Sequence, residues 1–170
     1  MSEEIRIYVA DLAAYNAGHL HGVWIDATLE LDEIQAQISA MLAASPVEGA
    51  EEYAIHDFEG FDGYRLDEYE SLESAHETAR FIEEYPEFGG ALLAHFNDLE
   101  QARKAAEEDY CGSYISLADY AEELTEETTS IPQHLAMYID YRAMARDLEC
   151  SGDVFTLETG FEQVHVFWNR

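Results

Sequence analysis

The sequence is poor in basic residues. It contains 8 Lys plus Arg against 37 Asp plus Glu, so the formal net charge is −29, and Lys104 is its single lysine. Proteins that bind nucleic acid directly rely on Lys and Arg to displace counterions from the phosphates. The composition therefore argues against a protein that binds DNA or RNA directly.

Cysteines and long apolar runs are also scarce. The two cysteines, Cys111 and Cys150, lack a CxxC spacing, which favours reduced, partly buried thiols of a cytosolic protein and leaves a single disulfide open. The N-terminal residues show no basic stretch followed by an apolar one, so no signal peptide is expected. No apolar run reaches the length of a membrane span. We expect a soluble, cytoplasmic protein.

What the chain does contain is a folded, aromatic-rich core under a strongly negative surface. Hydrophobic residues make up 48% of the sequence and aromatic residues 12%, too much for a disordered acidic tail. The acids recur from Glu3 to Glu162, and they are densest between Glu51 and Glu70, where Arg65 is the one cation. Such a charge repels itself within the compact state. The protein therefore either lives in high salt or uses its negative field.

Hydrophobic periodicity predicts an α+β fold made of three small modules. The first module, residues 1–62, is expected to hold strands at 5–9, 23–27 and 51–58 and a helix at 31–44, with residues 14–22 as a glycine-punctuated link. The second module, residues 63–110, is expected to be helical. The third module, residues 111–170, is expected to combine helices with a final strand pair.

Capping residues set the expected helix starts in the second and third modules. Ser71 precedes a helix that continues to Tyr85, and Asn97 or Asp98 precedes another after Pro86. In the third module Ser116 begins one helix, while Pro132 begins the longest helix of the chain, running to Glu149. A strand pair joined across Gly160 is expected to follow.

Motifs for chemistry are weak. An EF-hand loop starting at Asp57 fails at its fifth and sixth positions, Phe61 and Asp62, where the sixth must be glycine. His19 and His21 would share one face of a strand but have no evident third ligand. There is no nucleophile elbow, P-loop or dinucleotide fingerprint. We therefore expect no catalytic residue, no metal and no cofactor.

The spacing of the carboxylates is the most informative pattern. Glu70, Glu73, Glu77 and Glu84 recur at helical intervals, as do five acids of the helix that starts after Ser116. Like charges at such intervals lie about 5–6 Å apart and destabilise a helix, yet this spacing is close to that of successive phosphates on a DNA strand. At one charge per 1.7 Å of duplex, the net charge of −29 corresponds to roughly 15 base pairs or about 50 Å.

Two other interpretations remain open on these residues. An acid-catalysed hydrolase would use two of the many carboxylates, with a general acid in an apolar pocket. A halophilic protein would use the acids to stay solvated in high salt. The hydrolase predicts that one or two positions are essential, whereas the halophile predicts that folding itself needs molar salt.

Four long segments resemble the ArdA antirestriction family. They are YNAGHLHGVWIDA (Tyr15–Ala27), EEYAIHDFEGF (Glu51–Phe61), SLADYAEEL (Ser116–Leu124) and YIDYRAMARDLECSGDVF (Tyr138–Phe155), in the family's order. The acid-rich linkers at 62–73 and 125–131 match only in character.

The resemblance implies a plasmid- or transposon-encoded protein that acts in a bacterial host. Such proteins mimic bent B-form DNA and occupy the DNA-binding groove of Type I restriction–modification enzymes, so the partner would be the methyltransferase core. It also implies an elongated fold of three small domains, a homodimer formed through the third, no enzymatic activity, and an antirestriction motif near Tyr138–Glu149.

Site residues follow from the charge pattern taken together with the resemblance. The carboxylates expected to replace phosphates at the partner surface are Glu51, Glu52, Asp57, Glu59, Asp62, Asp67, Glu68, Glu70, Glu73, Glu77, Glu84, Asp109, Asp119, Glu122, Glu123, Glu126 and Glu127. The residues expected at the dimer contact are Leu135, Tyr138, Ile139 and Arg142.

Overall fold

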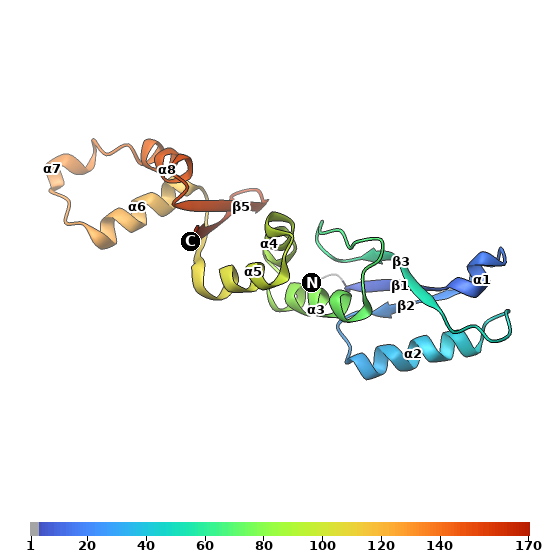
Figure 1. Ribbon diagram of the computed structural model, residues 1–170. Coiled ribbons are helices and arrows are strands. Elements are labelled where there is room, and N and C mark those ends of the chain that lie inside the picture. The colour runs from blue at the N-terminus through green and yellow to red at the C-terminus, as the bar shows by residue number, and fades with distance from the viewer. Residues whose placement is uncertain (1–3) are drawn as a thin grey trace. The chain divides into compact units, whose positions relative to one another are not determined.

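The computed structural model describes residues 4–170 and combines helices with two small antiparallel sheets, which confirms the α+β expectation (Figure 1). The chain divides into two compact units, residues 1–95 and residues 96–170. The division into three modules and the elongated form stay predictions. Among residues 4–170, no helix combines the length and apolar character needed to cross a bilayer.

A three-stranded sheet organises the first unit. Its strands are β1 (Arg6–Asp11), β2 (Gly22–Asp26) and β3 (Tyr53–Glu59), in the order β2-β1-β3. Helix α2 (Leu31–Ala43) runs beside β1 and β2 (Figure 1). The buried core of this unit includes Ile7, Val9 and Ile25 from the strands and Ile34, Ile38 and Met41 from α2. The expected strands and helix of this region are confirmed to within a few residues.

The link after β1 contains a short helix that periodicity did not predict. Helix α1 (Leu12–Asn16) begins at Asp11, whose side chain accepts a hydrogen bond of 3.1 Å from the Ala14 N–H. His19 and His21 follow in the irregular connection to β2, so their expected placement on one strand face is wrong. His21 instead contacts the Met41 carbonyl oxygen through Nε2, at 2.7 Å, which ties the link to the end of α2.

Two further helices complete the first unit. Helix α3 (Leu72–Glu84) starts at Ser71, as predicted, and Ser71 Oγ accepts the Ser74 N–H at 3.1 Å. Helix α4 (Gly89–Phe96) follows Pro86 and starts with two buried glycines. A Cβ on Gly90 would lie 2.8 Å from the Phe61 carbonyl oxygen. Glycine therefore allows the acid-rich loop after β3 to pack directly on α4.

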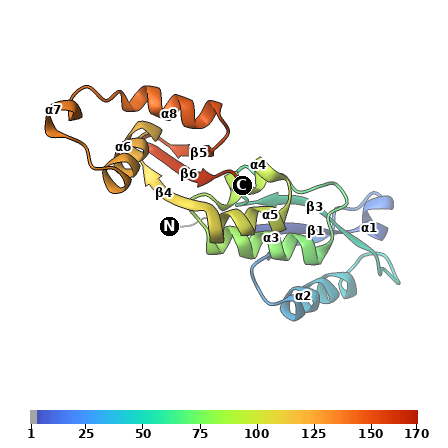
Figure 2. The same cartoon turned by 60° about the vertical axis from the view of Figure 1, so that its left-hand side comes forward.

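The second unit contains four helices, a π-helical turn and a three-stranded sheet, and two of its later helices lie beside that sheet in Figure 2. The elements in chain order are α5 (Leu99–Lys104), η1 (Ala105–Asp109), β4 (Tyr110–Tyr114), α6 (Leu117–Thr128), α7 (Gln133–Ala136), α8 (Tyr141–Cys150), β5 (Val154–Gly160) and β6 (Gln163–Trp168). The strand order is β4-β6-β5. Helices α6 and α8 pack against this sheet over a core that includes Tyr120, Ala145 and Val166.

The helix predicted from Pro132 to Glu149 is wrong as a single element. Helix α7 ends at Ala136, and α8 begins at Tyr141 with Asp140 as its cap, since the Asp140 carboxylate accepts the Ala143 N–H at 3.1 Å. An aspartate offers the backbone this competing hydrogen bond and so favours a new helix start over a helix interior. Strand β4 was also not predicted. The Ser116 cap and the final strand pair are confirmed.

Candidate functional site

The acid-rich segment after α2 presents its carboxylates to solvent. Glu51 and Glu52 precede β3, Asp57 and Glu59 lie on it, and all four are exposed. Asp62, Asp67 and Glu68 are exposed in the following loop, whereas Phe61 and Leu66 of the same loop are buried. Buried apolar residues and exposed acids thus alternate along this segment. The apolar side chains fasten the loop to the core, and the carboxylates are held on its outer side.

Helix α3 carries the first helical stripe of acids. Glu73, Glu77 and Glu84 are exposed, on the opposite side from buried Ala75 and Ala79. Glu70 lies before the helix and is half-buried. The prediction that Glu70 belongs to the helical stripe is therefore wrong. The Glu70 carboxylate accepts the Asp67 N–H at 3.1 Å and the Ser74 hydroxyl. Glu70 therefore fixes the entry into α3.

Helix α6 carries the second stripe. Asp119, Glu122, Glu123, Glu126 and Glu127 are all exposed, while Leu117, Tyr120 and Ala121 face the core. Because residues at these intervals are about 5–6 Å apart on a helix, the five side chains form one continuous negative surface. The helix is fixed at its start by Ser116, whose Oγ accepts the Asp119 N–H at 3.4 Å.

Three partly buried tyrosines lie close enough to the acids for their pKa values to be affected. Burial, together with a hydrogen bond to Glu123 and its charge, raises the pKa of Tyr114 well above its usual value. Burial and the charges of Glu122 and Glu126 raise the pKa of Tyr141. In the first unit, burial and the charges of Glu70 and Asp67 raise the pKa of Tyr64. Burial is the main cause of each increase, and the charges of the neighbouring acids add to it.

Asp109 differs from the other predicted carboxylates. It is only 7% exposed, and its Oδ1 lies 3.0 Å from Nε of Arg170 at the end of the chain. A buried carboxylate with a local cation cannot present its charge to a partner, so we leave Asp109 out of the proposed surface. Sequence reasoning could not distinguish it, because burial of a single acid in a π-helical turn has no sequence signature.

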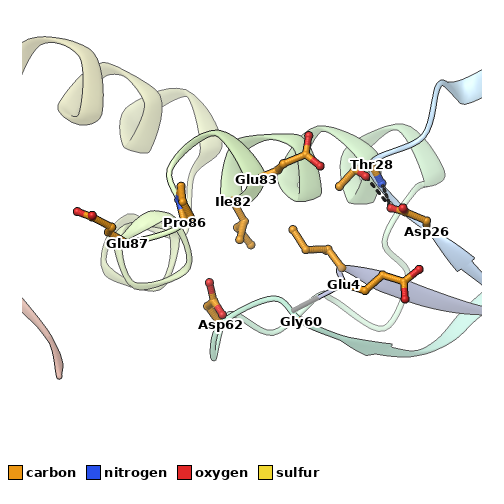
Figure 3. A pocket seen from close by; sticks show the side chains of 10 residues that line it. Glu4, Asp26, Thr28, Gly60, Asp62, Ile82, Glu83, Pro86 and Glu87 are labelled. Carbon is orange, nitrogen blue, oxygen red and sulfur yellow. Dashed lines mark hydrogen bonds between the residues drawn. The ribbon is translucent and has the colours of Figure 1, made fainter. Parts of the chain in front are cut away.

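The first unit also contains an acidic cavity of about 670 Å³ (Figure 3). Ile5, Ile82 and Pro86 contribute apolar lining, and the acidic lining residues are Glu4, Asp26, Asp62, Glu83 and Glu87. Asp26 is fixed by the Thr28 N–H and hydroxyl, at 2.9 and 2.6 Å from its Oδ1. Among the described residues, no group of three or more His, Cys, Asp or Glu side chains is arranged to hold a metal ion.

The residues predicted for a dimer contact lie around α7 and the start of α8. Leu135 is 47% and Tyr138 77% exposed, Arg142 is exposed, and Ile139 is half-buried. Met137, which sequence reasoning missed, is 80% exposed between them. A cavity of about 380 Å³ between α6 and α8 is lined in part by the apolar side chains of Leu124, Met144 and Leu148.

The two cysteines are both free thiols. Cys111 is half-buried, and burial raises its pKa above the usual value. Cys150 is exposed at the end of α8, so the expectation that both thiols are partly buried is wrong for this residue.

A comparison with protein families matches residues 7–163 of this chain to the model described as antirestriction protein (ArdA). A search of curated proteins finds no match.

Proposed function

The chain belongs to the ArdA antirestriction family, and we propose that it acts as a mimic of B-form DNA on Type I restriction–modification enzymes. In this proposal the exposed carboxylates take the place of phosphates in the DNA-binding groove of the methyltransferase core. The protein blocks restriction, and modification with it, by occupying that groove in the cytoplasm of the bacterial host. It performs no chemistry of its own and needs no cofactor.

The observation that carries the proposal is the exposure of the acids on fixed elements. Of the predicted carboxylates, all except Glu70 and Asp109 are exposed. Those on α3 and α6 stand on helices whose first turns are capped by Ser71 and Ser116. Charges held in place before binding cost little ordering free energy when the complex forms. This supports a surface built to present charge.

Presenting charge without bases also accounts for a broad target range. Contacts to phosphates position a protein on DNA but carry no sequence information. A mimic that offers only carboxylates therefore competes for the backbone-binding residues of the enzyme, whichever base sequence that enzyme recognises.

We further propose that the protein acts as a homodimer through the α7 region. The support is the exposure of Leu135, Met137 and Tyr138 within a few residues of one another. A second copy would bury this apolar surface and double the negative charge available to the partner. The dimer contact would also include Ile139 and Arg142.

Inhibition kinetics test the mimic mechanism. A purified Type I enzyme is assayed for cleavage and, separately, for methylation, at fixed protein and increasing DNA. We expect inhibition of both activities that is competitive with DNA and weakens as salt rises. Inhibition that persists at saturating DNA would contradict occupation of the DNA-binding groove and would point to another site.

A further inference from the structure

The face of the first sheet that lies opposite α2 carries an aromatic pair. Tyr8 of β1 is paired in register with Trp24 of β2 on one side and with Asp57 of β3 on the other. Side chains alternate between the two faces of a strand. Since Ile7 and Val9 enter the core, Tyr8 belongs to the opposite face, where Trp24 is 37% exposed.

The two rings form a supported platform. Their centroids are 5.4 Å apart and the ring planes are inclined by 48°. Gly22 lies two residues before Trp24 on β2, and a Cβ at this position would lie 2.7 Å from the Tyr8 ring. The absence of a side chain at Gly22 therefore leaves room for the Tyr8 ring. Trp24 is therefore held from the side by Tyr8 while part of its indole stays open to solvent.

A guanidinium already lies over this platform. The Arg6 Cζ is 5.2 Å from the centre of the Trp24 ring. Arg6 also pairs with Glu59, its neighbour in register on β3, and lies 4.0 Å from the Glu4 carboxylate. The arrangement shows that the indole accepts an arginine head group with a carboxylate beside it. Arg6, Glu59 and Glu4 all keep more than a third of their side-chain surface exposed.

We propose that the Tyr8–Trp24 platform is the docking point for an arginine side chain of the protein partner. This inference rests on the proposed function, in which the partner presents a basic DNA-binding surface. The incoming guanidinium displaces Arg6 from the indole and pairs with Glu59, with Asp57 adjacent on β3. The occupant is arginine and not lysine, because the planar, weakly hydrated guanidinium stacks on an aromatic ring while pairing with carboxylates.

The platform adds a kind of contact that the carboxylates cannot supply. Charge pairing at an exposed surface is screened by salt, whereas stacking on an indole depends little on ionic strength. Tryptophan, tyrosine and arginine are also enriched among the residues that contribute most to binding at protein interfaces. The face would therefore contribute affinity that persists when salt weakens the remainder of the acidic surface.

Peptide titration tests the site without the restriction enzyme. The chain has 2 tryptophans, so Trp168→Phe leaves Trp24 as the only one, and circular dichroism verifies that the variant is folded. An arginine-rich peptide and a lysine-rich peptide of equal length and charge are then titrated while Trp24 fluorescence is followed. We expect a saturable change and binding of the arginine peptide about 2- to 30-fold tighter than the lysine peptide.

Two arginine variants in the same background test the displacement of Arg6. Arg6→Gln empties the platform, whereas Arg80→Gln removes an equal charge from an ion pair with Glu30 on the same unit. We expect Arg6→Gln to tighten arginine-peptide binding more than Arg80→Gln does. Equal binding of both peptides, or Trp24 fluorescence that does not respond, would overturn the proposal. Fluorescence that changes with protein concentration alone would also overturn it, because the face would then be covered by a second copy.

Binding to the methyltransferase core supplies the second test. Trp24→Leu is compared with Tyr69→Leu, which removes an aromatic ring that is 90% exposed elsewhere on the same unit. We expect Trp24→Leu alone to lose about 3- to 30-fold in affinity, with an unchanged salt slope. Unaltered affinity of Trp24→Leu would refute the platform while leaving the mimic mechanism standing. If the wild-type chain binds arginine peptides at Trp24 but does not bind the methyltransferase core, the mimic mechanism is refuted instead.

Discussion

At the scale of single residues, the proposed binding surface consists of many similar carboxylates, so the proposal assigns no single one an essential role. Glu73, Glu77 and Glu123 are exposed positions on helix faces, and none of them is buried in an apolar pocket of the kind a general acid requires. Individual side-chain chemistry does contribute to the fold at the helix caps. Asp11 is the clearest case, because it is fully buried at the start of α1 and accepts the Ala14 N–H.

Neutralising one exposed carboxylate is expected to change inhibition little. We expect Glu77→Gln to lower affinity for the restriction enzyme by less than about 5-fold, because exposed ion pairs contribute about 0–1 kcal/mol each. A panel of single amide substitutions across α3 and α6, measured by inhibition of cleavage, checks this. One substitution that abolishes activity while its neighbours are silent would favour the hydrolase hypothesis over mimicry.

Asp11 is expected to make the fold sensitive to acid. The Ser45 hydroxyl, the N–H groups of Ala14 and Ala13 and the charge of His21 hold the pKa of Asp11 below its usual value, against the opposing effect of burial. A pKa that is lower in the folded chain means that ionised Asp11 contributes stability above about pH 4. That contribution is lost as pH falls through the lowered pKa.

The comparison with Asp11→Asn isolates this contribution from the many other acids, since asparagine also caps helices well. We expect the urea midpoint of the wild type to fall more steeply between pH 5 and pH 3 than that of Asp11→Asn. Parallel pH profiles for the two proteins would show that Asp11 is not coupled to stability in this way.

At the scale of elements, sequence patterns were most informative where capping and periodicity agreed. Ser71 and Ser116 each precede a run with clear helical spacing, and both helices begin where predicted. Prediction failed where a local cap interrupts an apolar pattern and where a long-range contact decides the structure. The break at Asp140 follows from a local cap that competes with a continuous apolar pattern, and β4 forms because it pairs with β6, more than fifty residues later.

The exposure of the acids on α3 and α6 could be predicted from helical periodicity, whereas the burial of Asp109 could not. A stripe opposite an apolar helix face must be exposed if that face is buried, as α3 and α6 both show. Burial of Asp109 depends on Arg170 at the far end of the sequence. The pairing of Trp24 with Tyr8 depends on strand register, which hydrophobic alternation alone does not fix.

The glutamates of helix α6 are expected to favour binding to the restriction enzyme while lowering the stability of the fold. Like-charged pairs at its helical intervals each destabilise by about 0.2–0.5 kcal/mol. We expect the combined variant Glu122→Gln, Glu123→Gln, Glu126→Gln and Glu127→Gln to be more stable than the wild type by about 1–2 kcal/mol. The same variant should bind the restriction enzyme more weakly and with a shallower salt dependence.

Urea unfolding and enzyme titrations on this α6 variant supply both measurements. Loss of stability together with unchanged binding would mean that these glutamates serve the fold and not the partner. A stabilised variant that inhibits less would support the assignment of α6 to the binding surface.

At the scale of the whole molecule, a net charge of −29 is carried by a chain that belongs to an antirestriction family. The exposed acids lie on both units, so we expect both units to contribute to binding. We also expect the apolar residues around α7 to contact a partner, because Met137 and Tyr138 are among the most exposed large apolar side chains of the second unit.

Disrupting the α7 surface is expected to dissociate the dimer without unfolding the chain. We expect Tyr138→Asp to convert a dimer into a monomer in sedimentation experiments, because it introduces an unpaired charge into an apolar contact. Phe161→Asp is the matched control, since Phe161 is 90% exposed in the same unit but lies in the turn between β5 and β6. A wild type that sediments as a monomer would contradict the dimer proposal directly.

The central claim is that this protein occupies the groove in which a restriction enzyme holds DNA. The most direct measurement holds a purified Type I methyltransferase core on a labelled duplex at moderate salt and adds the protein. We predict release of the duplex at near-stoichiometric protein, with displacement that weakens as salt rises. Retention of the duplex in the presence of excess folded protein would contradict the account.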